Sequence, residues 1–231
     1  MTFEHPAIFA AYSELFCGFL GRGDGQPGAN LNTLANPGSR ELFRRVAQAA
    51  GFEPDLVTAS FQVHGDGIVN VPPAGFTATG DSQITNQRGH LLTIRMADCA
   101  AVMLYDPVNR AVADLHSGWK GTHADITPKT IALMTEQYGT QPADLVAYIG
   151  PVNGPADYEV GMDVAEQFDQ KYWLPHAEDG KVYLDYSRRI YDQLLESGVS
   201  ENNIEHDQRS TYSNLSLHSF RREGAGYAPD F

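Results

Sequence analysis

The chain alternates between short apolar runs and polar stretches rich in glycine and proline, which is typical of a globular protein with both strands and helices. Runs that are apolar throughout, or that alternate in period two, are predicted to be strands: near Ile84 and at residues 56–63, 91–95, 100–105, 111–115 and 145–149. An Asp-Pro-Val-Asn turn at residues 106–109 predicts a β-hairpin. In the first strand, period two places Gln62 and His64 on one side and packs Val63 on the other.

Apolar positions that recur every three or four residues predict helices at residues 39–50, 127–138, 163–171 and 186–196. Ser39 is expected to cap the first of them. Gly51, Gly139 and Gly198 each follow a predicted helix, and glycine is the usual residue just beyond a helix C-terminus. The tail from Ile204 is predicted to be extended and then irregular.

No repeat, linker or break in composition interrupts this pattern, and 231 residues are enough to bury a sizeable core. We therefore expect one compact domain spanning residues 1–231, of the α+β class, with mixed β-sheets and flanking helices.

The overall charge argues against a nucleic-acid partner. The chain has 16 basic and 29 acidic residues, a formal net charge of -13, whereas a protein that binds phosphate backbones needs a basic surface. No apolar run is long enough to span a bilayer, and the first residues lack the pattern of a signal peptide. Two cysteines far apart do not form a disulfide framework. These features predict a cytoplasmic protein without a membrane partner.

The candidate chemistry lies at the ends of three apolar runs, which present His64, Cys99 and His116. Catalytic residues are common where a packed scaffold passes into a loop, so we interpret the three as one site. Two imidazoles and a thiolate suit Zn²⁺, and three protein ligands leave the fourth tetrahedral position open for water or substrate. The spacing matches no zinc-finger pattern.

The residues alone leave other interpretations open. Cys99 and His116 could form a nucleophile–base pair without metal, or all three residues could be structural. The glycine-rich stretch at residues 21–28, with Arg22, could hold an anion or be a surface loop.

Several motifs make the sequence resemble a known family. They are Gln62-Val-His-Gly65, Ala97-Asp-Cys99, His116-Ser-Gly-Trp-Lys-Gly121 and Tyr158-Glu-Val160, with Gly18-Phe-Leu-Gly-Arg22 near the start and Ser219-Phe-Arg221 near the end. Together they resemble the YfiH-like family, also called the laccase-domain or polyphenol oxidase family and now regarded as purine nucleoside phosphorylases.

The resemblance implies an α+β fold and a zinc enzyme with ligands at His64, Cys99 and His116. It also implies phosphorolysis of adenosine, inosine, guanosine and methylthioadenosine, together with deamination of adenosine. The expected partners are therefore a purine nucleoside and phosphate. The sequence does not indicate an oligomeric state.

Three alternative functions accompany this resemblance. The family is similar in outline to the catalytic domain of cytotoxic necrotizing factor toxins, so a metal-free hydrolase or deamidase using Cys99 and His116 is one. A zinc-stabilised binding protein is another, with His90 or His123 as a fourth ligand. A copper-dependent polyphenol oxidase is less expected, because a multicopper site needs many more histidines.

The sequence departs from the family pattern at three places. Lys120 stands where the family usually has arginine, Ser210-Thr211 where it commonly has Cys-Thr, and Gly226-Tyr227 where it has Gly-Arg. Lys120 keeps the charge but not the bidentate geometry of arginine. Arg22, Lys120 and Arg221 are the candidate cations for phosphate. Asp98, next to Cys99, is expected to cap the turn rather than to act as the catalytic acid.

Overall fold

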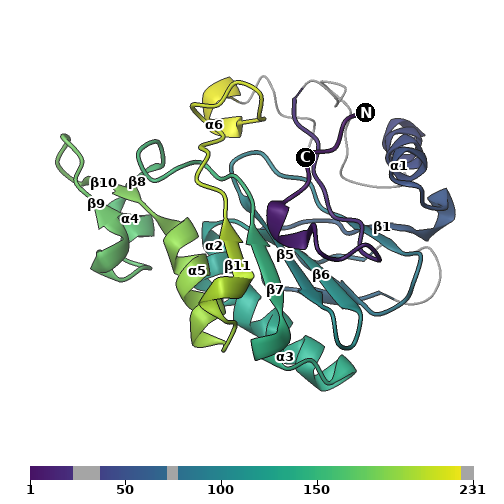
Figure 1. Ribbon diagram of the computed structural model, residues 1–231. Coiled ribbons are helices and arrows are strands. Elements are labelled where there is room, and N and C mark those ends of the chain that lie inside the picture. The colour runs from purple at the N-terminus through teal and green to yellow at the C-terminus, as the bar shows by residue number, and fades with distance from the viewer. Residues whose placement is uncertain (23–36, 72–77, 225–231) are drawn as a thin grey trace.

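The computed structural model describes residues 1–22, 37–71 and 78–224. A six-stranded mixed sheet forms its centre, and Figure 1 shows the strands β5, β6, β7 and β11 of this sheet side by side. The strand order is β11-β7-β5-β6-β3-β2. Its strands are β2 (Ile68–Asn70), β3 (Ser82–Thr85), β5 (Ala100–Asp106), β6 (Ala111–Ser117), β7 (Val146–Ile149) and β11 (Ile204–His206). The outer pairs β2–β3 and β7–β11 are parallel, and the inner pairs are antiparallel.

The β5–β6 hairpin is the longest pairing in this sheet, and its register decides which side chains share a face. Ala101 pairs with His116, and Met103 pairs with Asp114. Because side chains alternate along a strand, Asp114 and His116 lie on one face of β6, while Leu115 lies on the other. The predicted hairpin is thereby confirmed.

The two faces of the sheet are covered by different parts of the chain (Figure 1). On one face, α3 (Ile126–Tyr138) packs on β6 and α5 (Tyr186–Glu196) packs on β7. Leu104 and Leu115 are buried beneath these helices in the main core. On the other face, the N-terminal segment with η1 (Ala7–Phe9) covers Tyr105 and Tyr148.

Two small sheets flank the main one. β1 (Val57–Ala59) pairs in parallel with β4 (Leu91–Thr93), next to α1 (Pro37–Ala50). β10 (Lys181–Leu184) pairs with β8 (Glu159–Gly161) and β9 (Trp173–Leu174), beside α4 (Met162–Ala165). The remaining short elements are η2 (Pro54–Leu56), α2 (Trp119–His123), η3 (Pro142–Asp144), η4 (Gln170–Tyr172), η5 (Glu201–Asn203) and α6 (Phe220–Glu223).

Mixed sheets with flanking helices confirm the α+β prediction, but several elements differ from it. The predicted helix at 163–171 is wrong: α4 ends at Ala165, and Asp169 accepts a hydrogen bond from the Lys171 amide that starts a separate 3₁₀ turn. The predicted strand at 56–63 ends at Ala59. Val63 does not pack inward but is 51% exposed.

The other strands and helices agree with the predictions to within a few residues. Of the predicted strand at 91–95, residues 91–93 form β4, which pairs with β1. α1 begins at Pro37, two residues before the predicted cap Ser39. The side chain of Ser39, most of the glycine-rich stretch and Gly226-Tyr227 lie outside the described part of the structure. Within the described ranges, no helix has both the length and the apolar character to cross a membrane.

Asp106 closes the β5–β6 hairpin and gives a test of the fold. Its carboxylate is fully buried and accepts hydrogen bonds from the amides of Val108 and Asn109 and from the Asn109 side chain. Burial opposes ionisation, but these donors outweigh it and hold the pKa of Asp106 below its usual value. A carboxyl group of this kind stabilises the fold above its unfolded pKa, about 4, and loses that contribution as pH falls through its lower folded pKa.

We expect Asp106→Asn to lower the free energy of unfolding by about 2 kcal/mol at neutral pH, because the charged acceptor is lost. The difference from the wild-type protein should shrink as the pH falls below about 4. Urea unfolding of both proteins across this range measures it. A difference that stays constant with pH would show that the carboxylate charge does not contribute.

Candidate active site

Asp81 is a buried carboxylate that positions two of the three candidate residues. Its Oδ1 lies 2.8 Å from Nδ1 of His116, at the end of β6. The same carboxylate accepts hydrogen bonds from the amides of Val63, His64 and Gly65, at 3.1, 2.9 and 2.9 Å. Sequence analysis missed Asp81. The signal that could have identified it is that an imidazole ligand usually donates its second nitrogen to a carboxylate.

The same interaction explains why the predicted strand ends before His64. Three successive amides can point at one carboxylate only if the chain turns, and His64 has a φ of 58°, in the left-handed region. The turn exposes Val63 and places the imidazole of His64 beside that of His116, with 4.8 Å between the ring centroids.

Cys99 reaches the site from a second strained turn. Asp98, just before it, has a φ of 87°. The Asp98 carboxylate accepts hydrogen bonds from the Thr211 hydroxyl at 2.6 Å and from the Arg221 amide at 2.7 Å. Its carbonyl oxygen accepts from the Asn153 amide and the Tyr186 hydroxyl. Asp98 therefore holds the turn, as expected, and its carboxylate is already occupied.

The structure brings His64, Cys99 and His116 together. One nitrogen from each imidazole and Sγ of Cys99 all lie within 4.8 Å of one another, as a set of ligand atoms for a metal ion requires. Neither His90 nor His123 joins this group. His123 Nδ1 lies 2.9 Å from the carbonyl oxygen of Gln167 instead. Within the described residues, the fourth-ligand interpretation therefore has no support.

The two glycines of the His-Ser-Gly-Trp-Lys-Gly turn are required by close packing. A Cβ on Gly118 would lie 2.8 Å from Sγ of Cys99, and a Cβ on Gly121 would lie 2.9 Å from the carbonyl oxygen of Gly65. Real Cβ atoms do not approach other atoms this closely. Glycine at these positions lets the turn lie directly against Cys99 and the His64 loop.

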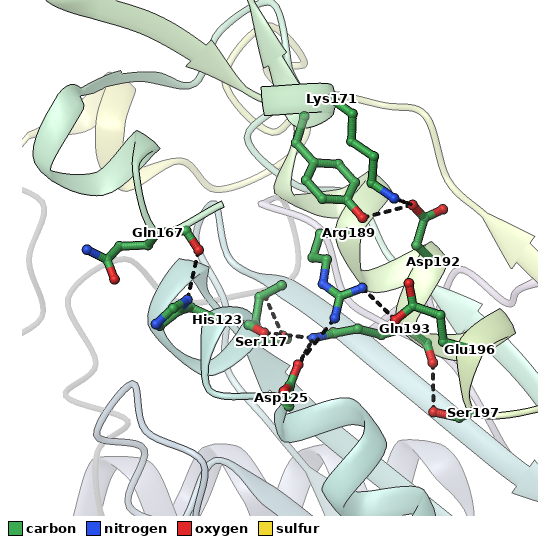
Figure 2. Close-up of polar contacts among 12 residues, drawn as sticks. Ser117, His123, Asp125, Gln167, Lys171, Arg189, Asp192, Gln193, Glu196 and Ser197 are labelled. Carbon is green, nitrogen blue, oxygen red and sulfur yellow. Dashed lines mark hydrogen bonds and ion pairs between the residues drawn. The ribbon is translucent and has the colours of Figure 1, made fainter. Parts of the chain in front are cut away.

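A buried polar network fixes this turn to α5 (Figure 2). The Ser117 hydroxyl lies 2.9 Å from the Thr122 hydroxyl, which donates to the Gly118 carbonyl oxygen. Gln193, fully buried on α5, donates to the carbonyl oxygen of Thr122 and to the carboxylate of Asp125. Hydrogen bonds from α5 thus hold the turn that follows His116 in place. Gln193 was not singled out by sequence analysis.

The three side chains also shift one another's ionisation. Burial alone would raise the pKa of Cys99, but the imidazoles of His116 and His64 outweigh it and lower that pKa to about 7. Burial alone would lower the pKa of His116, but the Cys99 thiolate and Asp81 raise it to about 9. The metal-free site therefore favours a thiolate beside an imidazolium, and the thiolate is the form that binds metals or attacks electrophiles.

The candidate cations for phosphate lie in different surroundings. Lys120 is exposed on α2, with Nζ 5.6 Å from the centre of the Trp119 ring. The guanidinium of Arg221 lies 5.4 Å from the centre of the Tyr158 ring. Arg22 forms an ion pair with Glu223 at 3.3 Å. Lys120 and Arg221 are thus tied to the turns of His116 and Cys99, whereas Arg22 is already paired.

Comparisons with known proteins place the chain in a family. Residues 39–227 match the family described as multi-copper polyphenol oxidoreductase laccase. A purine nucleoside phosphorylase from Bacteroides thetaiotaomicron is 36% identical over 57% of this chain and 51% of its own length. One from Corynebacterium glutamicum is 33% identical over 78% of this chain and 74% of its own. The chain thus spans about half of the Bacteroides relative.

The fold is also found among solved structures. A hypothetical protein YfiH from Bacillus licheniformis superposes with a TM-score of 0.75 and 25% sequence identity, over 80% of this chain and 75% of its own.

The packing of Gly118 gives a test of the site. We expect Gly118→Ala to displace Cys99 and to weaken binding of Zn²⁺ or Co²⁺ by about 10–100-fold, the usual effect of disturbing the support of a ligand. Gly67→Ala is the matched control, because a Cβ there meets nothing nearer than 3.5 Å. Competition with a chromophoric chelator measures both affinities. Equal affinities in the two variants would contradict the packing argument.

Proposed function

Because the chain belongs to the multi-copper polyphenol oxidoreductase laccase family, which includes the YfiH proteins, we propose that it is a zinc-dependent purine nucleoside phosphorylase. The observation that supports the proposal best is the group of two imidazoles and one thiolate. Relatives named purine nucleoside phosphorylase support the reaction class.

The residues fit a bound zinc ion. Zn²⁺ prefers nitrogen and thiolate ligands, and the lowered pKa of Cys99 makes its thiolate available near neutral pH. Asp81 supplies the carboxylate partner that commonly orients a histidine ligand. Oxidation at several copper ions would need more histidines than the single three-residue group found in the described ranges. When bound, zinc would supply a Lewis acid for an oxygen of substrate or water.

In the proposed reaction, phosphate attacks the anomeric carbon of the ribose as the glycosidic C–N bond breaks. The purine leaves with the bonding electrons and takes up a proton, and ribose 1-phosphate forms. Lys120 and Arg221 would hold the phosphate by charge-assisted hydrogen bonds. Asp81 would keep the His116 ring fixed during turnover, and the Asp98 turn would keep Cys99 in place. Adenosine deamination, in which water replaces the amino group, would use the same centre.

One observation favours a second candidate. Asp81, His116 and Cys99 are arranged as carboxylate, imidazole and thiolate, the order of groups in a cysteine hydrolase. A metal-free hydrolase or deamidase is therefore the alternative that an experiment must exclude.

The first test concerns phosphate. Cleavage of inosine or adenosine should require inorganic phosphate and yield ribose 1-phosphate. Lys120→Ala should raise the KM for phosphate about tenfold, with a smaller effect on the KM for nucleoside, because one charged contact is lost. Lys171→Ala is the control, since that exposed lysine pairs with Asp192 on α5. Unchanged phosphate kinetics in Lys120→Ala would remove this residue from the site.

The second test separates the zinc enzyme from the hydrolase. Chelation should abolish nucleoside cleavage and make Cys99 more reactive toward iodoacetamide, and added zinc should reverse both effects. Burial raises the pKa of the Cys17 thiol well above its usual value, so Cys17 should react slowly, and Cys17→Ser removes its signal. Full activity in verified metal-free protein, abolished by alkylation alone, would establish the hydrolase instead.

A further inference from the structure

The strands β1 and β4 lead toward the turns of His64 and Cys99, but their backbone pairing ends before it reaches either turn. The parallel ladder runs only as far as Ala59 and Thr93. Phe61 leaves the ladder and pairs with the segment that precedes β3. The two turns that follow must therefore be held relative to each other by something other than backbone pairing of β1 with β4.

The side chain of Gln62 takes over this role. Its Nε2 donates to the carbonyl oxygen of Arg95 at 2.7 Å, and its Oε1 accepts from the amide of the same residue at 2.9 Å. In return, Nη2 of Arg95 donates to the carbonyl oxygen of Ser60 at 3.2 Å. These hydrogen bonds, which we call the Gln62–Arg95 clamp, join the chain just before His64 to the chain just before Cys99.

A carboxamide is the side-chain group suited to this contact. It carries a donor and an acceptor in one plane, as a peptide group does, so it can bond to both the N–H and the C=O of one residue. A carboxylate offers only acceptors, and an ammonium group offers only donors. Gln62 thus takes the place of a residue on a neighbouring strand, while its own backbone is free to enter the turn at His64.

The other supports of the two turns connect them to different parts of the chain. Asp81 bonds to the amide of His64 and to the ring of His116 on β6, and so ties the first turn to the hairpin. The hydrogen bonds of Asp98 tie the Cys99 turn to residues that follow β7. The Gln62–Arg95 clamp joins the two turns to each other.

We propose that Gln62 is a positioning residue of the candidate metal centre, whose side-chain amide fixes the separation of the His64 turn from the Cys99 turn. The proposal rests on the metal site of the proposed function and on no step of its reaction. A residue that only stabilised the small β1–β4 sheet would change the stability of the fold. A positioning residue changes the metal affinity as well, because it sets the geometry of two ligands.

The test compares Gln62→Met with Thr93→Val in the full chain. Gln62→Met keeps the length of the side chain and removes both of its hydrogen bonds. Thr93→Val is the matched control, because it removes a hydrogen bond to the Thr58 carbonyl oxygen that joins the same two strands before they separate. Each variant should lower the melting temperature by about 2–4 °C.

Zinc affinity should separate the two variants. Competition with a chromophoric chelator should show that Gln62→Met binds Zn²⁺ about 10–100-fold more weakly than the wild-type protein, whereas Thr93→Val should bind it with unchanged affinity. Wild-type affinity in Gln62→Met, or an equal loss in both variants, would overturn the proposal.

A measurement on metal-free protein keeps this inference distinct from the proposed function. Gln62→Met should shift the backbone amide NMR signals of Gly65 and Cys99, and Thr93→Val should leave them in place. Shifts confined to residues 60–62 and 93–95 would overturn the proposal. Wild-type protein that binds no Zn²⁺ would refute the zinc enzyme, and these amide signals would then decide whether Gln62 connects the turns.

Gln62→Asn is a milder variant for the case in which Gln62→Met does not fold. Asparagine keeps the carboxamide but is one methylene shorter, so it can keep both hydrogen bonds only by drawing the Cys99 turn closer. We expect Zn²⁺ to bind this variant about tenfold more weakly. Wild-type affinity in Gln62→Asn would show that the length of the clamp does not set the ligand geometry.

Discussion

Four donors converge on the carboxylate of Asp81: the ring of His116 and three successive amides of the His64 loop. A fully buried carboxylate is costly unless it is hydrogen-bonded throughout, so the loop and the ring are held where they are by the need to satisfy one charge. Because the same carboxylate binds the His116 ring and the His64 amide, it also brings the two imidazoles close to each other. Burial opposes the charge, but these donors keep the pKa of Asp81 below its usual value.

The rest of the site depends on the close approach of two glycines to the segments that carry Cys99 and His64. Gly118 lies against Cys99, and Gly121 lies against the His64 loop. The hairpin and α5 support the turn that follows His116, and Gln193 of α5 donates a hydrogen bond to it (Figure 2). A site built in this way positions its groups before any ligand arrives, which is what a metal centre or a nucleophile requires.

The sequence predicted the parts of this structure that depend on local pattern. The β5–β6 hairpin and the helix at Tyr186–Glu196 were predicted because their periodicity and their turn or capping residues agree. The strand before His64 ends earlier than predicted because a distant carboxylate turns the chain at residues 63–65. The helix at 163–171 was wrong because Asp169 competes for the backbone. Asp81 and Gln193 were missed, since nothing in their local sequence distinguishes them from surface residues; only the need of a histidine ligand for a carboxylate partner points to an acidic residue such as Asp81.

The topology also sets the order in which the site can assemble. Cys99 and His116 flank one hairpin, whose strands meet through contacts close in sequence and can pair early in folding. The amide of His64 is held by Asp81, whose neighbour β3 must first dock antiparallel on β6. The three candidate ligands His64, Cys99 and His116 therefore come together only after the slower, longer-range pairing of β3 with β6. An ion bound by all three would stabilise the finished sheet and not the isolated hairpin. Metal binding would therefore favour the correctly assembled protein only at the last stage of folding.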